Sequence, residues 1–400
     1  MDAATPLKAV TPLDVFLAFL KQGLTAFGGP TAHLGFFRKE FVERRGWLSD
    51  AAFAELMAIC HFLPGPASSQ VGMAIGLRQA GLGGALAAFA GFTLPAAVGM
   101  IAFAYAAPFI QRAFGYSWMH GLKVAAAAVV IQALVQMARA LAVGPVRAGM
   151  AIGAAVGLIL AQGSLAAIAA IVAGMAFGAA LLRDTDEPAQ ALASESVDTG
   201  SAWIALGLFV TLLVGLPVLA VALGNTGLGL ASAFYRTGSL VFGGGHVVLP
   251  LLEREVVGRG WLDQDTFLAG YGFVQALPGP LFSFAGFVGA SQTYGPTGVV
   301  GGVIALFAIF LPSLLLIVGI LPFWDRLKAV PHARGALAGA GAATVGLLAA
   351  ALWNPLLFSA VQRPSDWALV AAAYIFLTVA KLPPWVVVLG FAAATGLFLR

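Results

Sequence analysis

Long apolar segments follow one another along almost the whole chain. A helix that crosses a bilayer needs about 20 mostly apolar residues. Segments near that length occur at roughly 12–28, 52–77, 82–108, 118–141, 146–161, 164–182, 202–223, 227–243, 266–290, 297–322, 332–354, 367–380 and 383–399. The alternating pattern of a membrane β-barrel is absent. The sequence therefore predicts an all-α polytopic membrane protein with about 12–13 transmembrane segments.

One long polar stretch interrupts this pattern. It begins at Arg183 and stays polar through Ser201, so we interpret it as a solvated linker. It divides the chain into a first transmembrane repeat at 1–182, a linker with a connecting helix at 183–226, and a second transmembrane repeat at 227–400.

The composition excludes several classes of protein. Apolar residues make up 60% of the chain and charged residues 10%, whereas soluble proteins have about 25% charged residues. A soluble enzyme, a nucleic-acid-binding protein and a disordered protein are thereby excluded. The net charge of +4 does not indicate a nucleic-acid partner, because basic residues of membrane proteins gather in cytoplasmic loops. The single cysteine, Cys60, excludes an internal disulfide and a cysteine-based metal cluster. We expect no cofactor and no metal.

The two halves of the chain resemble each other. A shift of 215 residues, which becomes 214 after one deletion, aligns identical residues of the two halves: Phe27-Gly28-Gly29 with Phe242-Gly243-Gly244, Glu40 with Glu255, Arg44 with Arg259, Gly46-Trp47-Leu48 with Gly260-Trp261-Leu262, Leu63-Pro64-Gly65-Pro66 with Leu277-Pro278-Gly279-Pro280, and Ser69 with Ser283. Because a tryptophan and a Pro-Gly-Pro recur in register, composition alone does not explain the match. The chain is a duplicated helical bundle.

Pro-Gly-Pro interrupts corresponding apolar segments in both halves. Proline removes a backbone donor and cannot continue a helix, and glycine allows unusual backbone angles. Such breaks are tolerated at membrane depth only where they face protein or a wet cavity. A simple kink is the alternative for one such motif. Its recurrence favours a functional break, as in secondary transporters with duplicated halves.

These motifs together resemble the chromate ion transporter family in its two-domain, long-chain form. The resemblance rests on Phe-Gly-Gly-Pro near the start, the stretch up to Arg-Gly-Trp-Leu, Leu-Pro-Gly-Pro, and the same set in the second half. It implies a multi-pass protein of the plasma or inner membrane that exports chromate, confers chromate resistance, and has halves of opposite orientation. Sulfate is a close structural analogue. One departure is Gly243-Gly244-Gly245-His246, where the first half has Gly28-Gly29-Pro30-Thr31.

A tetrahedral dianion in a membrane needs hydrogen-bond donors and compensating charge, because burial of an unpaired ion is costly. Pro66 and Pro280 precede apolar helical stretches, whose first N–H groups can bind an oxyanion. The turns after the two Pro-Gly-Pro motifs, 64–66 and 278–280, carry Ser68, Ser69 and Gln70 in the first half and Ser283 in the second. Helix capping is the alternative role of the serines.

Charge compensation has a candidate in each half. The repeat aligns Lys21 with Arg236, each inside an apolar segment and six residues before Phe-Gly-Gly. Two such charges match a dianion. The alternative is that both side chains extend to the membrane interface.

Further candidates lie near the same motifs. Gly28-Gly29 and Gly243-Gly244 can bring backbone N–H groups close to an anion. His246 follows the second pair and is of a residue type that titrates near neutral pH, with a packed or interfacial histidine as the alternative. Glu40 and Glu255 are candidate proton carriers, with a surface salt bridge to the arginine four residues later as the alternative.

The leading function is therefore a secondary transporter that exports chromate or a similar oxyanion, driven by the membrane potential and optionally by proton antiport. A passive anion channel is the alternative. A membrane-bound redox enzyme is disfavoured, because bis-histidine spacing and cysteine motifs are missing. The expected partners are the oxyanion and the lipid bilayer, with no nucleic acid, and a homodimer stays open.

Overall fold

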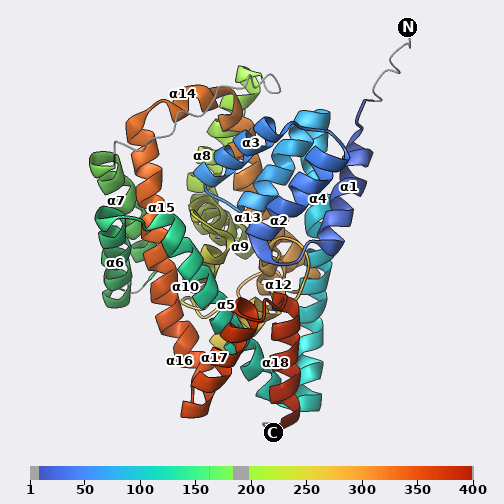
Figure 1. The fold of residues 1–400 in the computed structure, drawn as a ribbon, viewed down its shortest axis with the longest axis vertical. Coiled ribbons are helices and arrows are strands. Elements are labelled where there is room, and N and C mark those ends of the chain that lie inside the picture. Colours follow the sequence, from blue (N-terminus) through green and yellow to red (C-terminus); the bar gives the residue numbers. More distant parts are fainter. Residues whose placement is uncertain (1–8, 162, 183–197, 399–400) are drawn as a thin grey trace.

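The computed structural model describes residues 9–161, 163–182 and 198–398. Helices make up most of these residues and no strand occurs among them, which confirms the all-α prediction (Figure 1). Five helical segments in the described part of the chain are long and apolar enough to cross a membrane. Most of the polar linker predicted from Arg183 lies outside the described residues.

The first half contains α1 (Pro12–Thr25), α2 (Gly29–Phe37), the π-helical turn η1 (Arg38–Arg44), α3 (Asp50–Phe62), α4 (Ala67–Phe114), α5 (Ser117–Leu141), α6 (Pro145–Leu160) and α7 (Ser164–Leu181). The connecting helix is α8 (Thr199–Ala222). The second half contains α9 (Thr226–Leu240), η2 (Gly245–Val247), α10 (Val248–Val256), α11 (Gln264–Val274), η3 (Leu281–Ser283), α12 (Phe284–Ser291), α13 (Gly298–Ile320), η4 (Leu321–Phe323), α14 (Trp324–Lys328), α15 (Pro331–Ala351), η5 (Leu352–Leu357), α16 (Phe358–Ala360), α17 (Pro364–Thr378) and α18 (Pro384–Phe398).

The long helix α4 folds back on itself. Ala80 and Gly81 leave the helical conformation, and Gly81 has a φ of +61°. On either side of this turn Gly76 packs directly against the backbone of Gly84. Neither position has room for a side chain, so α4 consists of a short arm before Ala80 and a long helix at 82–114.

In the first half, α1 to α4 form two helical hairpins. The ring of Phe19 on α1 stacks on that of Phe41 at 4.5 Å between centroids, so α2 and η1 return along α1 and the tip is Phe-Gly-Gly. In the second hairpin, Gln79 Nε2 of α4 donates to the Trp47 carbonyl before α3 at 2.9 Å. Its two arms therefore start and end together, with Pro-Gly-Pro at the tip.

The second half repeats this arrangement. Thr293, the equivalent of Gln79, donates from its backbone N–H to the carbonyl of Trp261, the equivalent of Trp47, at 2.9 Å. Equivalent caps start both second hairpins, since Ser49 accepts from Ala52 N–H and Asp263 from Thr266 N–H.

The four apolar segments predicted at 12–28, 52–77, 227–243 and 266–290 thus belong to hairpins that turn back. The 14 residues of α1 span about 21 Å, less than the ~30 Å hydrocarbon core of a bilayer. Each hairpin enters and leaves on one side, and its broken tip is tolerated because it is buried in protein.

The hairpins of the two halves enter from opposite faces. Pro12 at the start of α1 packs against Gly83 of α4, whereas Val299 N–H, just after the second-half hairpins, donates to Tyr105 Oη of α4 at 3.1 Å. Tyr105 lies 22 positions after Gly83, a rise of about 33 Å along the helix, which matches the hydrocarbon core.

The helices that follow the hairpins are also antiparallel between the halves. Leu141 at the end of α5 lies beside Gly341 in the middle of α15. Lys123 near the start of α5 shares Asp265 with Ser359 of α16, which follows α15. In Figure 1, α6 and α7 lie at the upper left and α17 and α18 at the lower end. Because α8 adds one crossing between the halves, the second half is inverted relative to the first.

Inversion predicts opposite accessibility of equivalent positions. Asp50 and Gln264 are equivalent first residues of α3 and α11. In a Cys60→Ala background, we expect a membrane-impermeant thiol reagent to label Asp50→Cys and Gln264→Cys from opposite sides of sealed vesicles. Labelling of both from the same side would contradict the inverted arrangement.

Candidate functional site

The hairpin tips of the two halves are joined by two equivalent hydrogen bonds. Gly65 N–H donates to the Val241 carbonyl at 2.7 Å, and Gly279 N–H donates to the Ala26 carbonyl at 3.0 Å. Gly65 aligns with Gly279 and Ala26 with Val241 in the repeat. Each Pro-Gly-Pro tip therefore docks on the residue before the Phe-Gly-Gly motif of the other half, around a pseudo-two-fold axis.

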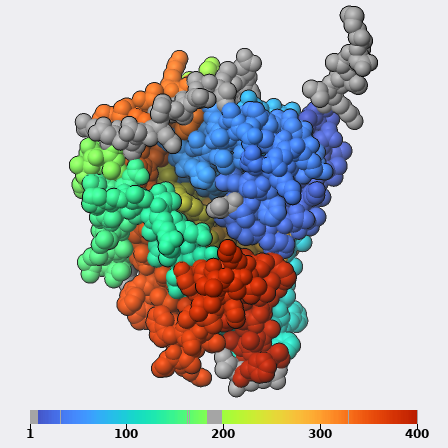
Figure 2. Space-filling view, viewed as in Figure 1, coloured from blue at the N-terminus to red at the C-terminus, as the bar shows by residue number. Residues whose placement is uncertain are grey.

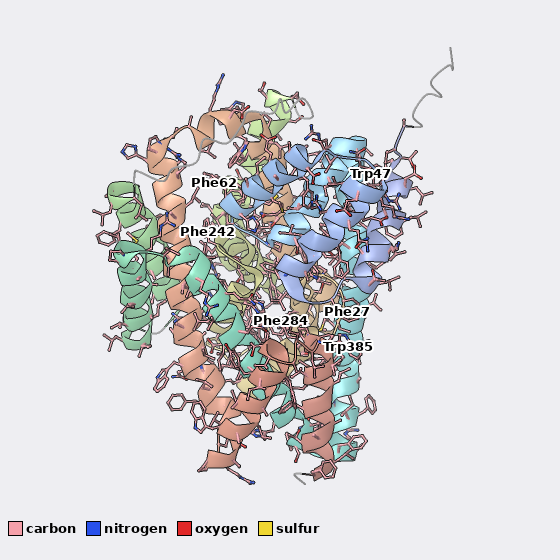
Figure 3. The ribbon with its side chains drawn as sticks, in the orientation of Figure 1. Phe27, Trp47, Phe62, Phe242, Phe284 and Trp385 are labelled. Carbon is pink, nitrogen blue, oxygen red and sulfur yellow. The ribbon has the colours of Figure 1, made fainter. Side chains whose placement is uncertain are left out.

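The tips lie beside the middle of the two long helices α4 and α13. A Cβ on Gly279 would lie 3.2 Å from both the Phe92 carbonyl oxygen and Ala96 Cβ on α4, halfway between Gly83 and Tyr105. Gly65 packs equivalently against Ser313, near the middle of α13. Figure 3 shows Phe27, Phe242 and Phe284, which lie at or beside the tips, in the interior of the molecule.

Equivalent tip glycines have positive φ angles. The angles are +131° at Gly65 and +102° at Gly279, with +102° at Gly28 and +76° at Gly243. L-residues rarely adopt these conformations, so the tips need glycine for backbone geometry as well as for space.

A cavity of about 180 Å³ opens where the tips meet. Gly28 and Gly29, at the N-terminus of α2, line one side, and Gly279 lines another. The first N–H groups of a helix have no internal acceptor, which suits them to an anion. The remaining polar lining comes from Gln132 and Gln136 of α5, His246 and Gln275.

Buried polar atoms without a partner gather around the same tips. Among the described residues, the buried side-chain atoms with no hydrogen bond include His33 Nε2, Ser69 Oγ, Gln70 Oε1, Thr93 Oγ1, Gln275 Nε2, Ser283 Oγ and Ser313 Oγ. Buried polar groups are normally satisfied. Their concentration at four converging tips indicates a region that receives water or a polar ligand.

The cavity is one-sided. The equivalent space beside Gly243 and Gly244 is occupied by Leu141 and Met137 of α5, whose side chains pack against these glycines. Trp385, at the start of α18, lies beside Phe27 with ring centroids 6.0 Å apart (Figure 3).

Lys21 and Arg236 do not line the cavity. Each holds the two arms of a Phe-Gly-Gly hairpin together through an ion pair. Lys21 Nζ lies 3.8 Å from Glu40 Oε2, and Arg236 makes two hydrogen bonds to Glu255, at 2.9 and 2.7 Å. Their role as anion ligands stays a prediction, and it requires these pairs to open.

The predicted pairs Glu40–Arg44 and Glu255–Arg259 are both present. Glu40 also pairs with Arg45 at 2.8 Å. Burial opposes ionisation of Glu40, but the hydrogen bonds from Arg44 and Arg45 outweigh it and lower the pKa of the carboxyl to about 2. Glu40 therefore stays ionised in this conformation. A proton-carrying role, which stays a prediction, requires the cluster to come apart.

The other predicted residues fall at the tips. Pro64, Pro66, Pro278 and Pro280 form the breaks. Ser68 Oγ lies 3.3 Å from His33 Nδ1. His246 Nδ1 lies 2.7 Å from Tyr271 Oη.

The sequence alone did not identify five polar residues at the tips as candidates: Gln132, Gln136, Gln275, His33 and Ser313. A signal for the first pair was present, because two glutamines four residues apart share one face of an apolar helix, and polar side chains in membrane segments tend to be functional.

The packing at Gly65 predicts a large effect of one methyl group. A Cβ there would clash with Ser313 Oγ and lie 2.6 Å from Gln70 Nε2. We expect Gly65→Ala to lower the free energy of unfolding by about 2–4 kcal/mol, from overpacking and left-handed strain together. Gly46→Ala is the control, because Gly46 also has a positive φ, +62°, but a Cβ there would meet no atom within 4 Å. This substitution should lower the free energy of unfolding by only about 1 kcal/mol. Equal losses in detergent unfolding experiments would show that the tip is not tightly packed.

Known proteins are similar to this chain over most of its length. A family profile described as "Chromate transporter" matches residues 13–179 and 228–397, one region in each half. A "Chromate transport protein" of Pseudomonas aeruginosa is 31% identical over 378 residues, covering 88% of this chain and 83% of that protein. Another of Cupriavidus metallidurans is 26% identical over 388 residues, covering 96% and 92%. A "Probable chromate transport protein" of Synechococcus elongatus is 27% identical over 337 residues, covering 84% and 82%. No solved structure matches this chain.

Proposed function

This chain belongs to the chromate transporter family, and on that premise we propose that it is a secondary transporter that exports chromate or a similar tetrahedral oxyanion. The anion sits in the cavity where the four hairpin tips meet. The single observation that carries this site is the reciprocal contact of the tips, Gly65 with Val241 and Gly279 with Ala26, beside a cavity lined by a helix N-terminus and amide side chains.

The lining suits an anion that is held by neutral donors. Gly28 and Gly29 present the first turn of α2, where the helix dipole favours negative charge. Gln132, Gln136 and Gln275 add amide groups. Hydrogen bonds to an ionised acceptor are about twice as strong as neutral ones, which offsets part of the cost of removing a dianion from water. Sulfate has the same shape and charge, so we expect it to compete.

The one-sided cavity supports alternating access over a passive channel. The first-half tip is open, whereas the equivalent space of the second half is filled by Leu141 and Met137. Because the halves are related by a pseudo-two-fold axis, exchanging their two arrangements would open the site to the other face.

The membrane potential favours export. Moving one charge through 100 mV is worth about 2.3 kcal/mol, so an inside-negative membrane favours outward movement of a dianion by about 4.6 kcal/mol. Export can therefore run without another coupled ion, and proton antiport would add to the gradient.

Flux measurements in proteoliposomes test this function. We expect uptake of radiolabelled chromate to saturate, to be inhibited by excess sulfate, and to increase when the inside is made positive by a potassium diffusion potential. Imposing a pH gradient at zero voltage tests proton antiport separately. Flux that rises linearly with chromate and shows no counter-transport would favour the channel, and absence of chromate flux would overturn the substrate.

The site itself is tested by one glutamine. Gln136→Leu removes a donor from the cavity, and a hydrogen bond to a charged group contributes about 1.5–3 kcal/mol. We expect the half-saturation constant for chromate to rise about ten-fold or more. Gln111→Leu on α4, outside the cavity, is the control and should leave it unchanged.

The same assay tests the charge hypothesis. If the half-saturation constant for chromate rises ten-fold in Lys21→Ala and in Arg236→Ala but is unchanged in Gln136→Leu, the anion binds at the ion pairs and not in the tip cavity.

A further inference from the structure

A second polar cavity lies far from the tips, at the surface between the two halves. It measures about 500 Å³ and is lined by Arg254 and Arg259 after the second-half tip, by Gln264 of α11, and by Asn354 and Trp353 of η5. Gln264 starts α11 at the open base of the second-half hairpins. The cavity therefore lies at a membrane face.

The two arginines are held in place from different directions. Arg254 Nη1 donates to the carbonyl oxygen of Gly163, in the loop between α6 and α7, at 2.8 Å. Arg259 pairs with Glu255 at 2.8 Å and its guanidinium lies 5.4 Å from the centroid of the Trp261 ring. Both side chains line the cavity and keep further donors, since a guanidinium has five N–H groups.

The charge of this cavity is weighted towards positive. Glu255 is shared by Arg236 and Arg259. Glu255 itself is not among the residues that line the cavity, and Glu253 is the carboxylate in the described lining. Burial raises the pKa of Glu253, although the charge of Arg254 opposes that shift. The amides of Gln264 and Asn354 add uncharged donors. An anionic group with several acceptor oxygens fits this set.

An apolar groove of about 590 Å³ adjoins this cavity. It runs along α6 and α7 and shares Leu158 with the basic cavity. Gly149, Gly153 and Gly157 of α6 line it, and a Cβ at any of them would meet no other atom within 4 Å. The α6–α7 pair forms the left edge of the molecule in Figures 1 and 2.

The aromatic residues beside the basic cavity mark an interfacial depth. The side chains of Trp353 and Phe358 are 54% and 64% exposed, and their rings pack edge to face with centroids 5.6 Å apart. Exposed tryptophan is typical of the boundary between lipid head groups and acyl chains.

We propose that a phospholipid with an anionic head group binds here, with its phosphate at Arg254 and Arg259 and one acyl chain in the α6–α7 groove. A basic cavity at head-group depth that continues into an apolar groove matches the two parts of such a lipid, and basic pockets between membrane helices are known to select anionic lipids. A free oxyanion would use only the basic cavity. The lipid would also tie α6 and α7 of the first half to α10, an arm of a second-half hairpin.

The first experiment uses the unmodified protein. Delipidated protein in a neutral detergent is mixed with phosphatidylglycerol, phosphatidylcholine or inorganic phosphate, and its thermal midpoint and retained lipid are measured, the latter by native mass spectrometry. We expect phosphatidylglycerol to bind about five-fold more tightly than phosphatidylcholine, because one basic residue near an anionic lipid is worth about 1 kcal/mol. Equal binding of both lipids would overturn the proposal, as would equal stabilisation by phosphate alone.

Two variants separate the head-group cavity from the groove. Arg254→Gln should abolish the preference for phosphatidylglycerol and leave phosphatidylcholine binding unchanged. Gly153→Leu should weaken both lipids, because its side chain occupies the groove. The matched controls are Arg112→Gln at the exposed end of α4 and Gly207→Leu on the exposed face of α8, where a Cβ also meets nothing. The proposed site would be contradicted if Arg254→Gln and Gly153→Leu bound both lipids with the same affinities as their control variants.

Discussion

The two hydrogen bonds between the hairpin tips are the contact on which this fold depends. A broken helix at membrane depth frees backbone groups that lipid cannot satisfy. Here the N–H groups of Gly65 and Gly279 find their acceptors only in the opposite half, at Val241 and Ala26. Neither half can bury its own tips alone. The duplication is therefore a structural requirement, and the glycines follow from it because a side chain at Gly65 would displace Ser313 or Gln70.

The same contact supports the proposed position of the substrate site between the halves. Tips that enter from opposite faces leave polar groups in the middle of the membrane, and several of them have no partner among the described side chains. In this conformation the acidic and basic residues at the open ends of the hairpins pair with one another. Glu40 and Glu255 hold the arms of the Phe-Gly-Gly hairpins together through ion pairs with Lys21 and Arg236. This agrees with our proposal that neutral donors hold the anion.

The sequence predicted the all-α class, the duplication and the breaks, because these depend on composition and on local chain chemistry. It did not distinguish a hairpin that turns back from a helix that crosses, since 12–28 and 52–77 have the same apolar character in either case. The stacking of Phe19 on Phe41 shows that the first of these segments turns back, and the contact of Gln79 with Trp47 shows it for the second. Lys21 and Arg236 were predicted to bind the anion because they are charges inside apolar segments. The carboxylate that pairs with each lies 19 residues later, on the returning arm of the hairpin. A pairing over that distance leaves no local pattern in the sequence. Gln132 and Gln136 are candidates only because the fold brings α5 past the tips, where both side chains line the cavity.

The position of a bound chromium atom would test the proposed anion site. An experimental structure with bound chromate, in which anomalous scattering at the chromium edge identifies the metal, would place the oxyanion without any assumption about transport. If the anion binds as we propose, a single chromium site lies in the tip cavity, beside Gly29, Gln136 and Gly279. Chromium bound at Lys21 or Arg236, with the tip cavity empty, would contradict it.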